Sequence, residues 1–245
     1  MPPDAIDFSR RADLSEFPEL MDEPCSREVL RDCLEDLSRV NRWFLGYRPT
    51  LKWLESLGLR ARGTVHILDV GCGYGDSLRR IEQWADERKL PVALTGCDLN
   101  PDTIAIAREA SPARSRIRWI ASDVFALKCN QPVDVVVSSL FTHHLTEDEI
   151  VRFITWMEAT AQIGWFINDL SRASIPYRLF KAFAKVANLH PFVQHDGPVS
   201  IARAFVPEDW RRVCEAAGLA EADISIQSFM PARLCVGRAK QTSDR

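Results

Sequence analysis

Three alternating glycines follow an acidic residue in the segment ILDVGCGYGDSL, residues 67–78. Asp69 stands two positions before Gly71, and Gly73 and Gly75 complete the run. Glycine permits a tight turn between a strand and a helix, and it lets the backbone approach a ligand because no side chain intervenes. In open parallel sheets, ligands bind beyond the carboxyl ends of the strands. The segment therefore predicts a ligand-binding loop behind a buried strand.

The spacing of the loop indicates which kind of ligand it binds. The dinucleotide fingerprint has glycines at its first, third and sixth positions, but the sixth position counted from Gly71 is Asp76. At low dielectric the Asp69 carboxylate repels a pyrophosphate and attracts an ammonium group. We therefore expect a ligand with a positively charged amino acid end. A nicotinamide dinucleotide is disfavoured.

Two further aspartates follow later predicted strands. Asp98 ends the strand VALTGCD, and Asp123 ends the strand RIRWIASD. A lone aspartate after a strand is often only a turn cap, and that interpretation stays open for each of the two. Three acids at the ends of successive strands nevertheless indicate one shared site. A carboxylate in that position is a strong acceptor for paired hydroxyl groups.

The acid–glycine pattern resembles the first motif of the class I S-adenosylmethionine-dependent methyltransferases, and GCDLNP and ASDVF resemble their second and third motifs. The resemblance covers about residues 64–161. It implies S-adenosylmethionine as the cofactor, with Asp98 binding the ribose hydroxyls, Asp123 the adenine amino group, and Val124 giving a backbone contact. The residues expected to bind the cofactor are Asp69, Gly71, Cys72, Gly73, Gly75, Asp98, Leu99, Asp123, Val124 and Ser139.

Strand and helix patterns alternate along most of the chain, which predicts an α/β fold with a mostly parallel sheet and helices on both faces. The resemblance implies a Rossmann-like sheet of seven strands whose last strand is reversed. A stripe of apolar residues predicts a helix from Ser26, and a short helix is expected at 50–57. Strands are predicted at 64–70, 92–98, 116–123, 133–140, 164–169, 223–229 and 233–238, and helices at 76–89, 100–110, 146–162, 175–187 and 207–217.

The chain is expected to form one methyltransferase domain, residues 61–245, behind an N-terminal helical cap, residues 1–60. The segment 188–206 has two prolines, one glycine and no clean period, so we expect an irregular insertion that acts as a substrate lid. Because the cap and the lid are where such enzymes differ, they are expected to determine the choice of substrate.

Two adjacent histidines, His143 and His144, lie in FTHHLTEDE between the fourth predicted strand and a capped helix. Transfer of a methyl group to a hydroxyl requires alignment and removal of one proton, and histidine titrates near neutral pH. We therefore predict that His144, or else His143, is the base; the alternative is that they cap the helix or pack under the sheet. A metal site is not expected, because adjacent histidines point differently and no third one has a suitable spacing.

The acceptor is predicted to be small and apolar. Amino-group methyltransferases usually have Asn or Asp, two prolines and an aromatic residue where this chain has residues 138–141, SSLF, so oxygen or carbon acceptors are favoured. The aromatic-rich cap and lid suit a phenolic, quinone-like or polyketide-derived ring. The sequence also resembles bacterial methyltransferases associated with type III polyketide pathways. Candidate substrate contacts are Trp43, Tyr47, Asn168 and His195.

Composition disfavours several other partners and locations. The 31 basic and 34 acidic side chains leave a formal charge of −3, which argues against a nucleic-acid partner. We expect a cytoplasmic protein without stable membrane insertion, because no apolar run is long enough for a signal peptide or a span. Seven scattered cysteines predict no disulfide framework. An NAD(P)-dependent oxidoreductase and a non-catalytic cofactor-binding module remain the alternatives, and the oligomeric state is left open.

Overall fold

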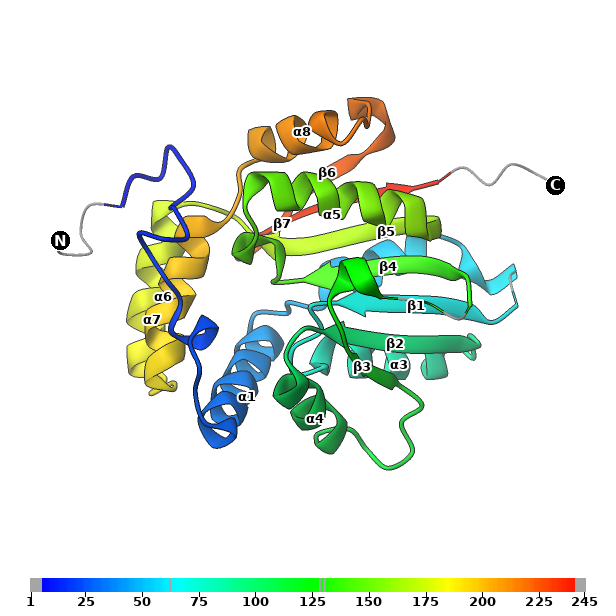
Figure 1. Ribbon diagram of the computed structural model, residues 1–245, viewed down its shortest axis with the longest axis horizontal. Helices are drawn as coiled ribbons and strands as arrows, with labels where there is room; N and C mark the ends of the chain where they lie inside the picture. The colour runs from blue at the N-terminus through cyan, green and yellow to red at the C-terminus, as the bar shows by residue number, and fades with distance from the viewer. Residues whose placement is uncertain (1–5, 62, 128, 130, 241–245) are drawn as a thin grey trace.

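The computed structural model describes residues 6–61, 63–127, 129 and 131–240 (Figure 1). Its centre is one sheet of seven strands in the order β3-β2-β1-β4-β5-β7-β6. The strands are β1 (Val65–Val70), β2 (Val92–Asp98), β3 (Arg118–Ala121), β4 (Val133–Ser139), β5 (Ala161–Leu170), β6 (Ser225–Phe229) and β7 (Arg233–Ala239).

The first five strands are parallel, whereas β7 pairs antiparallel with both β5 and β6. This confirms the predicted Rossmann-like sheet and its reversed last strand. The strand order changes direction between β1 and β4, which pair directly with each other. Ligands of open α/β sheets bind at such a switch point, beyond the carboxyl ends of the strands. The glycine loop therefore begins at the position where a site is expected.

Helices cover both faces of the sheet, as predicted. On one face lie α2 (Arg48–Ser56), α3 (Asp76–Glu87) and α4 (Pro101–Glu109), which bury Leu54, Ile81 and Ile104. On the other face α5 (Glu147–Thr160) and α8 (Pro207–Ala216) bury Phe153 and Trp210. Full burial of one such large apolar side chain contributes about 1.5–3 kcal/mol to stability. The two cores fix the position of the carboxyl ends of the strands, where the glycine loop begins.

Three further helices lie beyond the carboxyl ends of the strands (Figure 1). They are α1 (Arg27–Trp43), α6 (Ser174–Val186) and α7 (Pro191–Arg203), here called the cap helices. Cys33, Ala184 and Val193 are buried where they meet. The Ser26 side chain accepts a hydrogen bond from the Val29 amide and caps α1, so the predicted helix start is confirmed. The other helix of residues 1–60, α2, packs instead on β5.

The expectation of an irregular segment at 188–206 is wrong, because most of it is helix α7. The His190 side chain accepts a hydrogen bond from the Phe192 amide, and Pro191 occupies the first turn, where a missing amide proton costs nothing. Buried residues lie all round the helix from Val193 to Arg203. Because residues 198–203 are buried on every face of the helix, this half has no separate apolar stripe, and the sequence therefore showed no helical period.

Residues 6–23, here called the N-terminal strap, run across α7 and contain the short 3₁₀ helix η2 (Leu20–Asp22). The Asp196 carboxylate of α7 accepts hydrogen bonds from the amides of Leu20 and Met21, at 2.8 and 3.0 Å. The Arg172 side chain donates to the Phe8 carbonyl. These polar bonds hold the strap in place together with apolar contacts, because Met21 packs on the buried residues of the cap helices and Phe8 packs on the Tyr177 ring.

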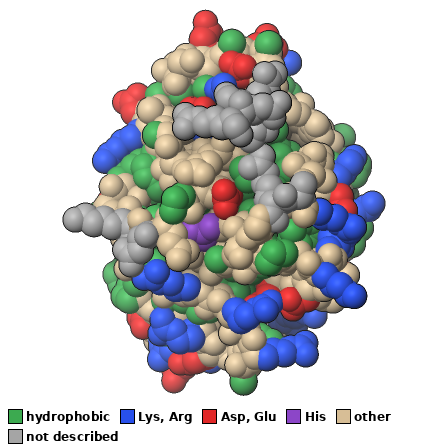
Figure 2. All heavy atoms as spheres, turned by 90° about the vertical axis from the view of Figure 1, so that its right-hand side faces the viewer, with side chains coloured by type: hydrophobic (Ala, Val, Ile, Leu, Met, Phe, Trp, Pro, Cys, Tyr) green, Lys and Arg blue, Asp and Glu red, His purple; other side chains and the backbone are tan. Residues whose placement is uncertain are grey.

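Two features of the described residues concern a membrane span and the distribution of charge on one face. None of their helices combines the length and the apolar character that crossing a membrane requires. Acidic and basic side chains are interspersed with hydrophobic ones on the face shown in Figure 2, which lies opposite the cap helices.

Gly75 provides a test of how the glycine loop is packed. Its φ of +75° is strained for other residues, and a Cβ atom there would overlap the ring of Trp119. We expect Gly75→Ala to lower the free energy of unfolding by about 1–3 kcal/mol in chemical denaturation. Gly58→Ala is the matched control, because Gly58 has a φ of +61° but no neighbour within 4 Å. Equal losses in the two variants would show that the Trp119 contact is unimportant.

Candidate active site

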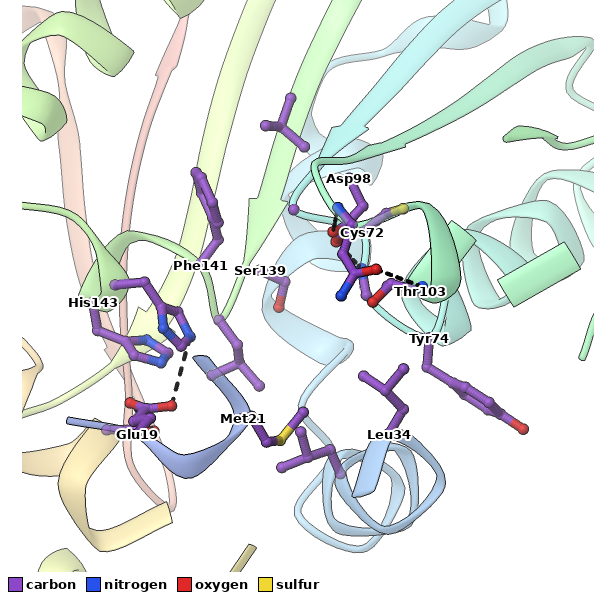
Figure 3. A pocket seen from close by; sticks show the side chains of 18 of the residues that line it. Glu19, Met21, Leu34, Cys72, Tyr74, Asp98, Thr103, Ser139, Phe141 and His143 are labelled. Carbon is purple, nitrogen blue, oxygen red and sulfur yellow. Dashed lines mark hydrogen bonds and ion pairs between the residues drawn. The ribbon is translucent and has the colours of Figure 1, made fainter. Parts of the chain in front are cut away.

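A cavity of about 630 Å³ lies between the carboxyl edge of the sheet and the cap helices (Figure 3). One half is formed by the glycine loop and the ends of β2, β3 and β4. The other half is formed by the 3₁₀ helix η5 (Thr142–His144), the strap, α1 and α7. We call them the loop half and the cap half.

Asp98 is the best-held acid of the loop half. Its carboxylate accepts hydrogen bonds from the amides of Gly73 (3.0 Å) and Asn100 (3.1 Å), one on each oxygen. Burial raises the pKa of Asp98, although these two amides act in the opposite direction. Each oxygen keeps a further lone pair for a ligand hydroxyl. Cys72 and Leu99, also predicted for this site, line the same half.

Asp69 lies fully buried next to the cavity rather than in its lining. Neither of its carboxylate oxygens has a hydrogen-bond partner among the described residues. Burial raises the pKa of Asp69 well above its usual value, and the charges of Asp76 and Asp98 add to this effect. A buried polar group without a partner is costly. A cationic ligand group nearby would therefore stabilise this part of the protein.

Arg233 is a buried cavity residue that sequence analysis missed. Its guanidinium donates to Asn41 Oδ1 at 2.7 Å and approaches the Asn168 backbone oxygen at 3.5 Å, and it forms no ion pair within the described part of the chain. Burial lowers the pKa of Arg233. Because β7 is antiparallel, its first residue lies at the carboxyl edge. The sequence signal that could have indicated Arg233 is its position as the first residue of a strand predicted to be reversed.

The three glycines have different roles. Gly71 and Gly73 line the cavity, and both have positive φ. A Cβ atom on Gly71 would approach the Phe141 ring to 2.6 Å. Gly75 packs against Trp119 and is absent from the described lining. A direct contact between Gly75 and a ligand therefore has no support in this geometry.

The remaining predicted cofactor residues line the cavity as well. Asp123 accepts a hydrogen bond from the Phe125 amide at 2.9 Å, so it also caps the short 3₁₀ helix η4 (Val124–Ala126). The Ser139 hydroxyl donates to the Asn168 carbonyl at 3.3 Å. One carboxylate oxygen of Asp123 therefore caps a turn, as the alternative interpretation expected, and the residue also lines the cavity.

His143 is held rigidly in the cap half. Its Nδ1 lies 2.7 Å from Asp169 Oδ1, and the other carboxylate oxygen of Asp169 accepts from the Thr142 hydroxyl at 2.5 Å. Burial alone would raise the pKa of Asp169, but its interactions with His143, the Thr142 hydroxyl and the Leu170 amide hold it well below its usual range. This pairing leaves Nε2 of His143 available to a ligand.

His144 lies beside His143, with ring centroids 4.3 Å apart, and its Nε2 is 3.8 Å from Glu19 Oε2 (Figure 3). Glu19 belongs to the strap and was not predicted. Its other oxygen accepts from Ser200 (2.9 Å) and Arg203 (3.1 Å) of α7. No local pattern in the sequence indicates that Glu19 approaches the histidines, because its placement depends on α7.

None of the four predicted substrate residues is in the described lining of the cavity. Trp43 packs on Phe183 with half its surface exposed, and the Tyr47 hydroxyl donates to Asp76. The Asn168 amide donates to the backbone of Gly46 and to Thr50, and His195 lies against Asp196. The expected aromatic cover is mostly aliphatic instead, being formed by Met21, Leu30, Leu34, Leu37, Val40, Phe180, Val193 and Ile201.

Comparison with known proteins agrees with this geometry. Residues 67–163 match a family model described as methyltransferase domain. No curated protein matches the sequence.

Solved structures with a similar fold include the plantazolicin methyltransferase BpumL in complex with S-adenosylhomocysteine (TM-score 0.62, 13% identity, 88% of this chain and 95% of that chain). Magnesium protoporphyrin IX methyltransferase from Synechocystis PCC 6803 has a TM-score of 0.54 and 14% identity over 89% of this chain and 90% of its own. Human N-acetylserotonin methyltransferase has a TM-score of 0.61 and 12% identity over 89% and 57%.

At such low identity the structural likeness establishes the fold alone. The family match covers the strand ends, the glycine loop and Asp98, which are the parts that form the loop half of the cavity. The protein therefore contains a methyltransferase domain, and the matched residues include those that form the loop half of the cavity.

Proposed function

We propose that the protein methylates an oxygen or carbon atom of a small phenolic, quinone-like or polyketide-derived acceptor. The observation that carries the proposal is that one cavity joins the acid-lined loop half to a histidine pair under an aliphatic cover. The loop half suits a polar, charged cofactor, and the cover suits an apolar ring. The proposal treats α1 and residues 188–206 as the parts that choose the acceptor.

The residues of the loop half fit S-adenosylmethionine. Asp98 would accept from its ribose hydroxyls, and Asp123 and Val124 would contact its adenine. Among the described residues, the Asp69 carboxylate has no hydrogen-bond partner and the Arg233 guanidinium has no ion-pair partner. They would match the ammonium and the carboxylate, respectively, of the amino acid end of the cofactor. When bound, the cofactor supplies an electrophilic methyl group on its sulfonium sulfur.

In the cap half, the protein has to exclude water, align the acceptor and take up its proton. Met21, Leu34 and Phe180 contribute to an apolar wall. His143 suits the role of base better than His144, the first choice from sequence, because Asp169 fixes its Nδ1 and leaves Nε2 to accept the hydroxyl proton. His144 is the second candidate.

Replacement of Asp98 tests the cofactor assignment. We expect Asp98→Ala to weaken S-adenosylhomocysteine binding at least about tenfold in titration calorimetry, because hydrogen bonds to a charged group contribute about 1.5–3 kcal/mol. The exposed Asp86→Ala is the control and should bind like the wild type. Unchanged affinity in Asp98→Ala would contradict the assignment of this edge to the ribose.

The raised pKa of Asp98 predicts a pH dependence of cofactor binding. Burial favours the protonated acid, so this carboxyl takes up a proton at a higher pH than an exposed aspartate does. The protonated form accepts fewer hydrogen bonds. We expect affinity for S-adenosylhomocysteine to fall as the pH is lowered from neutral, and the fall to be smaller in Asp98→Asn. If the wild type and Asp98→Asn show the same pH dependence of affinity, a titrating group other than Asp98 is responsible.

Replacement of His143 tests the cap half. We expect His143→Gln to lower turnover about 10²–10⁴-fold, the usual contribution of a general base, in an assay that follows label from the cofactor into a panel of phenols and hydroxyquinones. Affinity for S-adenosylhomocysteine should be retained, which also shows that the variant is folded. His195→Gln, outside the cavity, is the control. Full turnover in His143→Gln would show that alignment alone suffices.

A further inference from the structure

Glu19, His143 and His144 form a cluster that the sequence did not predict as a unit. Each offers one ligand atom, and these three atoms all lie within 4.8 Å of one another. We propose that they form a binding site for a divalent first-row transition-metal ion in the cap half of the cavity. The donors come from the strap and from η5, so folding alone brings them together.

The donor set matches this class of ion. Two imidazole nitrogens and one carboxylate oxygen are typical of zinc and non-haem iron sites. Metal–ligand bonds of about 2.0–2.2 Å place neighbouring donors about 3–3.5 Å apart. Glu19 Oε2 and His144 Nε2 are already 3.8 Å apart, and no two of the three ligand atoms are more than 4.8 Å apart, so shifts of about 1 Å bring all three to bonding positions. Three protein ligands leave coordination positions open to an acceptor.

Two of the three ligands are also oriented by hydrogen bonds to the atom that does not face the metal, as metal ligands usually are. Asp169 binds Nδ1 of His143, which leaves Nε2 as the metal-binding atom. Ser200 and Arg203 bind Oε1 of Glu19 and leave Oε2 for the ion. These partners are buried, and they fix the side chains before any ion arrives.

The charge around the cluster indicates which ions it prefers. Arg203 Nη1 lies 3.1 Å from Glu19 and already offsets part of its negative charge. Calcium requires six to eight oxygen ligands, and magnesium also prefers oxygen. A site with one partly neutralised carboxylate and two imidazoles therefore favours Zn²⁺, Co²⁺ or Fe²⁺ over Ca²⁺ and Mg²⁺.

The consequence for chemistry rests on the proposed function, although metal binding itself does not. A hydroxyl bound to such an ion loses its proton more readily than a free one. His143 can act as a base only in the metal-free protein, because its Nε2 lone pair binds the ion when the metal is present.

The test is a Co²⁺ titration of the full chain after treatment with a chelator and dialysis, followed by visible d–d absorption. We expect one equivalent to bind, Zn²⁺ to displace it, and excess Mg²⁺ to leave it in place. Glu19→Gln and His144→Gln should each weaken binding at least about tenfold, as loss of even a supporting residue does. His195→Gln, an exposed histidine outside the cluster, is the matched control.

His144→Gln is the decisive variant, because its side chain is 30% exposed whereas Glu19→Gln disturbs the buried pair with Arg203. No binding to the wild type, or unchanged binding in His144→Gln, overturns the inference. A parallel titration with S-adenosylhomocysteine separates the two proposals. Cofactor binding without metal binding contradicts only the metal site, and metal binding without cofactor binding contradicts only the proposed function.

Discussion

The buried carboxylate of Asp169 organises the part of the cap half that carries the two histidines. It lies at the end of β5 and binds the Thr142 hydroxyl, the His143 amide and the His143 ring, so it ties the 3₁₀ helix η5 to the sheet. Burial acts to raise the pKa of this carboxyl, but the contacts with His143 and Thr142 lower it, so Asp169 stays ionised within the core. The orientation of His143 is therefore set by the core of the fold and not by a mobile loop.

The preceding residue, Asn168, extends the same junction. Its carbonyl accepts a hydrogen bond from the Leu140 amide, and its side chain donates to Gly46 and Thr50. The end of β5 thus links β4, the loop before α2 and η5. This explains why a polar residue predicted to contact substrate is instead buried in the framework. In a strand enclosed on both faces, a polar side chain persists only where its hydrogen bonds are made.

What the sequence predicted was local. The glycine loop, the acids at the strand ends and the helix start at Ser26 each depend on a few consecutive residues, and all of them are present in the structure. The sites it missed depend on distant contacts. Glu19 is positioned by Arg203, 184 residues away, and Arg233 reaches the cavity only because β7 is antiparallel. The sequence of α7 shows no helical pattern of apolar residues, because other elements bury its residues 198–203 on every face.

The two halves of the cavity therefore have different physical origins. The loop half is built by the sheet and by α3, whose shapes follow from dense apolar cores. The cap half needs the strap, and the Leu20 and Met21 amides hold it on Asp196 through polar bonds. Each such bond to a carboxylate contributes about 1.5–3 kcal/mol, far less than the summed burial in the two cores. Changes in the strap can thus alter the shape of the cap half, while the loop half, which is built by the sheet and α3, keeps its geometry.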